Sequence, residues 1–517
     1  MKRQNLISDM QKGQIKMSSN KLKTSVTNIR LEKKPIPLLV VLISFKPKGA
    51  KSWEDGIQMI STTKEHWYNL CFGDEGYTLK NFYKEMSGGK IYFEPVHVMG
   101  ETKTPGVLEV VLDMPHPNRM NDDMPGKNHG VAFKCIAEAL RAADEYVDFA
   151  YYDKDGGGYL SGDEFNVLLI HAGYDGLSGI KRCKGVHWGV YANCGSLPEF
   201  EDEDDVEGAR SPTLDGVKLC ARGKGCYTLV GEYRMTEGDF YPHALGTIAH
   251  ELGHSIGFHD VYDYDREVKG WPLPYLFSLM GHGNYGNDES DNIYRRGFVP
   301  QHLDPFQKIR SGIMDPDVVS KDGEYTVHPL SSENANIIKI TTPDPKEYFL
   351  IENRQMTGFC KGIYRKTFGV NERGEDCHFC ENYKEGGVIV WHIDEDIFDT
   401  YSVIKRTNGS GTWLPDGETE GTERHDPGIV ALFKDGFDEN GLLKNDGVFV
   451  PGYPEDPFFR KGDVFNSNEF ISAATHTKSL NSFPEGYSQD TYNLKIEFLD
   501  FDEATGDIKI RVTQKTK

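Results

Sequence analysis

The residues best suited to catalysis lie in residues 242–260, which read PHALGTIAHELGHSIGFHD. This stretch contains the pattern H-E-x-x-H, in which His250 and His254 are four positions apart and Glu251 follows the first histidine. Apolar residues recur through it at helical spacing, so both imidazoles should reach one metal ion from one side of a helix. Glu251 would then accept a proton from a zinc-activated water and pass it to the leaving amine.

The residues after this helix should supply a third ligand. Gly257 predicts the end of the helix, because glycine tolerates the left-handed backbone that ends many helices. The extended pattern H-E-x-x-H-x-x-G-x-x-H places Asp260 at its last position, and a carboxylate oxygen is an accepted zinc ligand. His259 is the rival, since it is one residue away and imidazole is the commoner ligand. We favour Asp260, which keeps the turn length of the pattern, and expect zinc (Zn2+) on His250, His254 and Asp260.

A second signal follows about twenty residues after this helix, in residues 278–283 with the sequence SLMGHG. We expect a tight turn that carries Met280 beneath the metal, as in zinc peptidases with the extended motif. The bland alternatives are a methionine in ordinary core packing and a core helix whose histidines only form hydrogen bonds. The occurrence of both motifs at this separation favours the metal site.

Residues 153–164, with the sequence DKDGGGYLSGDE, match the twelve-residue calcium loop. Position 5 is a glycine, which offers no side-chain ligand and should weaken binding. Residues 165–171 are expected to form a buried strand, so the loop would lack the usual pair of helices; the alternative is a solvated glycine-rich turn. The candidate ligands for calcium (Ca2+) are Asp153, Asp155, Tyr159 through its carbonyl, Ser161 and Glu164.

The composition is that of a folded and acidic protein. The 517 residues include 38% hydrophobic and 12% aromatic residues, and the net charge is −22. This charge argues against nucleic acid as a partner and suits a protein that binds divalent cations. No apolar run approaches the roughly 18 residues that cross a bilayer, so no membrane span is expected. Residues 35–45 (PIPLLVVLISF) are interpreted as a buried strand, and the chain shows no export signal.

Nine cysteines leave at least one thiol free in any intramolecular disulfide scheme. Two pairs are close enough in sequence for local disulfides: Cys183 with Cys194, and Cys220 with Cys226. Cys360 could join the C-x-x-C of residues 377–380 in a small zinc knot. We favour disulfides or free thiols there, because a single C-x-x-C is a weak zinc signal.

The elements that must position these residues divide the chain into three parts. Residues 1–34 are polar and basic and are predicted to be a flexible arm, residues 35–314 a zinc peptidase domain, and residues 315–517 a β-rich domain. In the second part we expect strands at 38–45 and 90–99 and helices within 65–86, 132–143 and 300–313. In the third we expect strands at 324–328, 336–341, 347–352, 387–393, 495–498 and 507–512, the last two forming a hairpin.

With these motifs established, the chain resembles the immune inhibitor A family of metallopeptidases. The matching stretches follow one another over roughly residues 37–460 and are LLVVLISF, FGDEGYTLKNFYKEMSGGKIYFEPV, YYDKDGGGYLSGDEFNVLLIHAGYD, HELGHSIGFHDVYDYD, SLMGHG, PQHLDPFQKI, YFLIENRQ and GGVIVWHIDED. The resemblance implies a metzincin-like fold of the α+β or α/β class, with a twisted, mostly parallel sheet and an active-site helix.

The same resemblance implies a secreted bacterial zinc endopeptidase that acts on proteins or peptides, with zinc on His250, His254 and Asp260 and with Glu251 as base. One departure is His259, which stands where the family usually has proline; another is the high number of cysteines. Two other classes stay open: a metal-dependent hydrolase acting on something other than protein, and a non-catalytic binding protein of the same fold. The intact Glu251 argues against the binding protein.

Overall fold

The computed structural model describes most of the chain beyond the basic N-terminal segment. The described residues are 34–117, 129–175, 193–195, 211–219, 227–236, 239–261, 277–288, 297–363, 367–370, 376–379, 385–395, 398, 413–415, 425–427, 429–432, 458–467 and 492–516. The predicted arm lies outside these residues except for Lys34, which begins the first strand.

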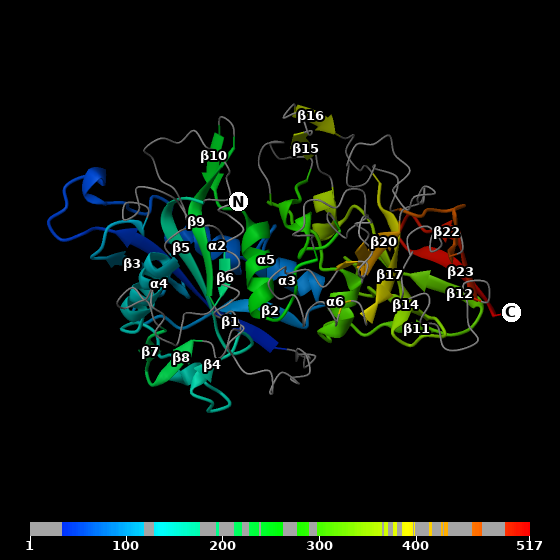
Figure 1. Cartoon of the computed structure of the whole chain (residues 1–517), viewed down its shortest axis with the longest axis horizontal. Helices are drawn as coiled ribbons and strands as arrows, with labels where there is room; N and C mark the ends of the chain where they lie inside the picture. Colours follow the sequence, from blue (N-terminus) through cyan, green and yellow to red (C-terminus); the bar gives the residue numbers. More distant parts are fainter. Residues whose placement is uncertain are drawn as a thin grey trace.

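The first part of the chain is built on a seven-stranded sheet in the order β10-β9-β5-β1-β2, with β3 on β1 and β6 on β9 (Figure 1). Strand β1 runs parallel to β2, β3 and β5, and β5 runs parallel to β9. Only β6 and β10 run antiparallel to their neighbour β9, so the predicted mostly parallel sheet is confirmed. The strands are β1 (Lys34–Phe45), β2 (Ile91–Pro95), β3 (Val107–Leu112), β5 (Asn166–Tyr174), β6 (Asn193–Gly195), β9 (Tyr227–Thr236) and β10 (Asp239–Pro242).

The continuous apolar run of β1 follows from burial on both faces of this sheet. Leu38, Val40 and Leu42 belong to one hydrophobic cluster, whereas Leu39 and Val41 belong to another. Successive side chains of a strand point to opposite faces, so each face of β1 contributes to its own core. Residues 35–45 are therefore a buried strand, as predicted.

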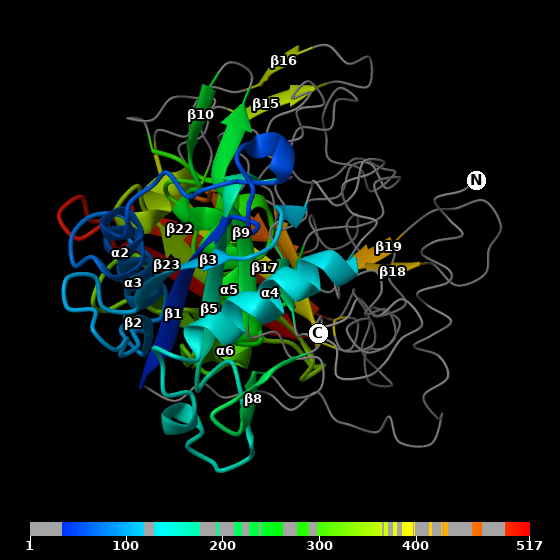
Figure 2. The ribbon, with the colours of Figure 1, turned by 90° about the vertical axis from the view of Figure 1, so that its left-hand side faces the viewer.

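Helices cover both faces of the sheet, as Figure 2 shows with α4 crossing in front of the strands and α5 behind them. Helix α4 (His129–Ala143) packs on one face. Helices α2 (Lys64–Phe72), α3 (Leu79–Met86) and α5 (Leu245–Ser255) share the cluster on the other. The threonine hydroxyls that precede α2 and α3 accept hydrogen bonds from backbone N–H groups of the first turn, which is why these helices begin there.

Some predicted elements are longer than those in the structure. The helix predicted over 300–313 is α6 (Pro305–Arg310). Its start is fixed by the Asp304 side chain, which accepts from the Gln307 N–H, with Pro305 as the first helical residue. Gly312 has a φ of 75° just after its end. The strand predicted over 90–99 is β2, which ends at Pro95.

The last part of the described chain is β-rich, as predicted. A five-stranded sheet has the order β11-β13-β14-β17-β20 and a four-stranded sheet the order β12-β23-β22-β21. Strands β22 and β23 form the predicted hairpin. The strands are β11 (Asp317–Val319), β12 (Gly323–Val327), β13 (Ile338–Thr341), β14 (Glu347–Arg354), β17 (Gly387–Asp394), β20 (Ile429–Leu432), β21 (Val464–Asn466), β22 (Tyr492–Phe501) and β23 (Ile508–Thr516).

Smaller elements complete the described chain. One short sheet contains β4 (Tyr159–Leu160), β7 (Thr213–Leu214) and β8 (Val217–Leu219), and two pairs are β15 (Thr367–Val370) with β16 (Asp376–Phe379) and β18 (Trp413–Pro415) with β19 (His425–Pro427). The 3-10 helices are η1 (Trp53–Asp55), η3 (Ala150–Tyr152), η5 (His282–Tyr285) and η6 (Gly358–Ile363). None of the helices within the described ranges has the length and hydropathy of a bilayer-spanning helix.

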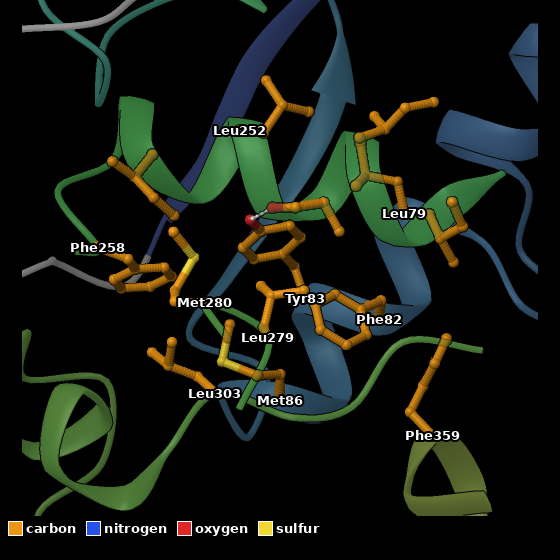
Figure 3. Packing of buried hydrophobic residues seen from close by; sticks show 14 of the residues in the cluster. Leu79, Phe82, Tyr83, Met86, Leu252, Phe258, Leu279, Met280, Leu303 and Phe359 are labelled. Atoms are coloured by element: carbon orange, nitrogen blue, oxygen red, sulfur yellow. Dashed lines mark hydrogen bonds between the residues drawn. The ribbon is translucent and has the colours of Figure 1, made fainter. Parts of the chain in front are cut away.

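One hydrophobic cluster continues from the first sheet to the second. It includes Phe82 of α3, Leu252 of α5, Leu350 of β14 and Trp391 of β17, all fully buried. Figure 3 shows Tyr83 of α3 and Met280 below α5, with Leu252 on the upper side of the same helix. The hydroxyl of Tyr83 in this group donates to the Ala249 carbonyl at 2.7 Å, so α5 is fixed to α3 by a buried hydrogen bond as well as by packing. The division between residues 314 and 315 stays a prediction.

Candidate metal centre

Helix α5 carries the H-E-x-x-H pattern and is held closely by its neighbours. Its backbone approaches η5 so tightly at Gly246 that a Cβ there would lie 1.8 Å from the Asn284 carbonyl oxygen. Two residues before the helix ends, a Cβ on Gly253 would lie 3.0 Å from the sulfur of Met280. The helix ends at Ser255, and Gly257 has a φ of 100°, so the left-handed residue predicted after the helix is present.

The structure brings His250, His254 and Asp260 together. The Nε2 atoms of the two histidines each lie 3.1 Å from Oδ1 of Asp260. Four ligands about 2.0 Å from a tetrahedral zinc ion are about 3.3 Å from one another, so this spacing is that of neighbouring zinc ligands. Among the residues that are described, these three form one of two groups whose ligand atoms could share a metal ion.

The Nδ1 atoms of both histidines form hydrogen bonds with backbone carbonyls, which leaves Nε2 available to a metal. Nδ1 of His250 lies 2.9 Å from the Leu279 carbonyl, and Nδ1 of His254 lies 3.0 Å from the Phe258 carbonyl. A carbonyl only accepts, so each Nδ1 carries a proton, and Nε2 is the nitrogen of each ring that can bind a metal. Such outer contacts orient imidazole ligands in zinc proteins, so the donor set fits the metal.

The pKa shifts of His254 and Asp260 show that this site favours positive charge. Burial lowers the pKa of His254, but the charge of Asp260 and its hydrogen bond outweigh burial and raise this pKa to about 9. Burial also raises the pKa of Asp260, yet the charge of His254 and the hydrogen bonds from both imidazoles hold it below its usual range. Asp260 is therefore a carboxylate and attracts cations.

Glu251 lies on α5 beside the three candidate ligands. Burial raises the pKa of its carboxyl, and the charges of His250 and His254 act in the opposite direction. A carboxylate with a raised pKa takes up a proton more readily than an exposed one, which is the property that a general base needs.

The turn predicted around Met280 is present. The N–H groups of Gly281 and Gly283 both donate to the Ser278 carbonyl at 3.0 Å, and Met280 is fully buried. The turn touches two parts of the site: its Leu279 carbonyl binds His250, and its Met280 carbonyl accepts from Val261 at 3.0 Å. Figure 3 shows the Met280 sulfur beside the ring of Phe258, below α5.

His259, the rival third ligand, lies outside the ligand group. Its residue is exposed, and its imidazole lies edge-on to the ring of Phe398 with the centroids 6.0 Å apart. The role of Asp260 as third ligand stays a prediction, but the geometry around His250 and His254 favours it over His259.

The predicted calcium loop, residues 153–164, has the expected surroundings: η3 precedes it and β5 follows it, so no pair of α-helices flanks it. Asp153, Asp155 and Glu164 form the second group of potential metal ligands in the described chain. The N–H of Gly157 donates to both Asp153 at 3.0 Å and Asp155 at 2.7 Å. Of the two further candidates, the Ser161 hydroxyl donates to Glu164 at 2.6 Å, and Tyr159 lies in β4.

Of the cysteines, Cys71, Cys135 and Cys360 are buried free thiols. Burial raises the pKa of the Cys360 thiol to about 12, so the thiolate that zinc needs is strongly disfavoured there. The pairs predicted for Cys183 with Cys194 and Cys220 with Cys226, and the side chains of residues 377–380, lie outside the described parts.

Sequence patterns did not single out the polar residues that hold the site together. Gln307 of α6 binds the backbone of His259, Asp304 binds Gln307, and Ser278 of the turn binds Asp304. The sequence signals near them are PQHLDPFQKI, which contains Asp304 and Gln307, and SLMGHG, which contains Ser278; the family resemblance rests on both stretches. A glutamine in such a stretch has no spacing rule that marks its function.

Comparison with known proteins finds a distant relative. No protein-family model matches the chain. Immune inhibitor A of Bacillus thuringiensis subsp. alesti is 25% identical over 317 residues, which make up 58% of this chain and 43% of that protein. The chain thus spans less than half of that relative, and the resemblance predicted from the motifs is present as a similarity over this part.

Among solved structures, wild-type OgpA from Akkermansia muciniphila is 15% identical with a TM-score of 0.25, covering 71% of this chain and 85% of OgpA. Catalytically inactive OgpA in complex with an O-glycopeptide (glycodrosocin) substrate is 13% identical with a TM-score of 0.26, covering 71% and 86%. Likenesses at these TM-scores carry no argument about this chain.

Proposed function

We propose that this chain is a zinc-dependent endopeptidase that hydrolyses peptide bonds of protein substrates. The observation that carries the proposal is the convergence of two imidazole Nε2 atoms on one carboxylate oxygen, each at 3.1 Å, with both Nδ1 protons committed to backbone carbonyls. The similarity to Immune inhibitor A supports the proposal independently.

In this proposal His250, His254 and Asp260 hold the metal and leave one position open. A zinc ion there supplies Lewis-acid chemistry, polarising the scissile carbonyl and making water acidic enough to lose a proton near neutral pH. Glu251 takes that proton on its carboxylate and delivers it to the leaving amine nitrogen, after which its carboxylate is restored. In this proposal the Leu279 and Phe258 carbonyls hold the Nδ1 protons of the two histidines and so direct each Nε2 toward the metal.

The substrate class, the location and the second cation belong to the same proposal. Proteins or peptides are the substrates that a metzincin-like site would take, and nucleic acid does not suit a chain with a net charge of −22. We propose that the protein acts outside the cell, where calcium is abundant. The loop 153–164 would bind calcium there through Asp153, Asp155 and Glu164.

The decisive experiment combines metal analysis with digestion of casein. The wild-type protein should contain about one zinc per chain and cleave casein, and a chelator should abolish cleavage. Glu251→Gln should keep zinc and the fold while cleavage falls by at least about a thousandfold. Near-normal cleavage by this variant would remove Glu251 from the mechanism. A zinc-loaded wild type that cleaves no protein would instead favour a binding protein or a hydrolase of other substrates.

A further inference from the structure

One side chain from a distant part of the sequence, Gln307, forms two hydrogen bonds with the backbone just before Asp260. Gln307 lies in α6 and is 3% exposed. Its Oε1 accepts from the His259 N–H at 2.7 Å, and its Nε2 donates to the His259 carbonyl at 3.0 Å. Those two backbone groups belong to the peptide planes on either side of the His259 Cα, and the second plane is bonded directly to Asp260.

Gln307 is held in one orientation. Asp304, which caps α6, accepts from the Gln307 N–H through Oδ1 and from the Gln307 Nε2 through Oδ2, both at 2.9 Å. The Ser278 hydroxyl of the turn around Met280 donates to the same Oδ2 at 2.9 Å. Nε2 therefore faces two acceptors and Oε1 faces a donor, so only one orientation of the amide satisfies all partners.

The backbone groups of the other residues around Asp260 are also held by hydrogen bonds. The Phe258 carbonyl is bound by His254, and the Val261 N–H donates to the Met280 carbonyl at 3.0 Å. Gln307 supplies the restraint on the residue between Phe258 and Asp260. The carboxylate of Asp260 thus extends from a short segment whose peptide groups are fixed on both sides.

We propose that Gln307 is a positioning residue for the metal site: it sets the backbone from which Asp260 reaches the metal. This inference rests on the proposed zinc function. Gln307 does not touch the metal, and it acts through the two peptide groups of His259. Outer contacts of this kind commonly change metal affinity by about 10- to 100-fold when they are removed.

The chain offers a matched control for a test of this proposal. Gln301 is also a buried glutamine near the turn, 1% exposed, and its Nε2 donates to the Phe359 carbonyl at 3.2 Å. It lies six positions before Gln307 and binds backbone on the side of η6. Gln301→Leu and Gln307→Leu therefore delete comparable buried amides, but only the second deletion removes the contacts to His259.

The experiment measures zinc dissociation constants by competition with a chelator, the visible spectrum after cobalt substitution, and the melting temperature of each metal-free protein. We expect Gln307→Leu to weaken zinc binding by about 10- to 100-fold and to alter the cobalt spectrum. Gln301→Leu should stay within about threefold of wild type in affinity while losing comparable thermal stability. Gln307→Met, which keeps the length of the side chain and removes both hydrogen bonds to His259, should weaken zinc binding to a similar degree as Gln307→Leu.

Wild-type affinity and an unchanged cobalt spectrum in Gln307→Leu would overturn the inference, as would equal losses of affinity in Gln301→Leu. If Gln307→Leu does not fold, Gln307→Met decides by the same criteria. A wild-type protein that binds no zinc would overturn the proposed function itself, so the two failures are distinguishable.

Discussion

A buried histidine between the two sheets makes the protein sensitive to acid. His302 is fully buried, and its Nε2 lies 2.9 Å from Oε1 of Glu85 on α3. Its Nδ1 lies 3.1 Å from Nζ of Lys308 on α6, which is also fully buried. An ammonium group only donates, so Nδ1 accepts, Nε2 donates to Glu85, and the imidazole is neutral. Burial, followed by the charge of Lys308, lowers the pKa of His302 to about 4, against the opposing pull of Glu85.

The size of the effect follows from this pKa. In the unfolded chain His302 binds a proton below about pH 6.5, whereas in the folded protein it does so only near pH 4. The unfolded state therefore takes up protons first as the pH falls from about 6.5 to about 4, and the free energy of unfolding decreases across that window. Between pH 7 and pH 5 this single group should cost about 2 kcal/mol of stability.

The assay is urea unfolding followed by tryptophan fluorescence, at several pH values from about 7 to about 4.5. His302→Gln is the matched variant, because its amide can donate to Glu85 and accept from Lys308 but does not titrate. We expect the variant to lose about 2 kcal/mol less than wild type between pH 7 and pH 5. Every other group that titrates there, including the candidate metal ligands, is common to both proteins. Parallel acid destabilisation of the two proteins would refute a lowered pKa for His302.

Three further predictions concern other parts of the molecule. Asp260→Ala should lose zinc, whereas His259→Ala, which changes an exposed side chain outside the ligand group, should keep it; metal analysis giving the reverse would make His259 the third ligand. Calcium should raise the melting temperature of metal-stripped wild type but not of Asp153→Ala, because a cation that binds only the folded state stabilises it; no response in wild type would contradict a calcium loop. Gly246→Ala should cost about 3 kcal/mol or more, since its Cβ would lie 1.8 Å from a backbone carbonyl oxygen. Gly253→Ala should cost less, because its nearest neighbour at 3.0 Å is a flexible thioether, and equal melting temperatures for these two variants would contradict the packing of α5.

The sequence predicted those features whose cause is local. The spacing of His250 and His254 and the glycine after them predict a helix, its end and the direction of the following turn, because each depends on neighbouring residues alone. The apolar run of β1 and the turn of the β22–β23 hairpin are likewise encoded within short segments. The length of α6 was overestimated, because apolar spacing continues past the points where Asp304 and Gly312 limit the helix.

The contacts that position the candidate ligands were beyond prediction for a physical reason. Gln307 is 48 residues from His259 in the chain, and Leu279 is 29 residues from His250. Hydrophobic periodicity gives the faces of single elements, and it carries no information on which backbone group a distant polar side chain will meet. The order of strands in the sheets is non-local in the same way.

Helix α6 connects the metal segment to the second sheet through two consecutive residues. Gln307 binds the backbone beside Asp260, and Lys308 binds His302 within a buried charged group that includes Glu352 and Arg354 of β14. Burial lowers the pKa of Lys308 to about 8, while the charge of Glu352 acts to raise it, so the lysine is charged at neutral pH and is held by the negative charge on β14. The β-rich part of the chain thus packs against the helix that holds the backbone beside Asp260, although it supplies none of the three clustered side chains.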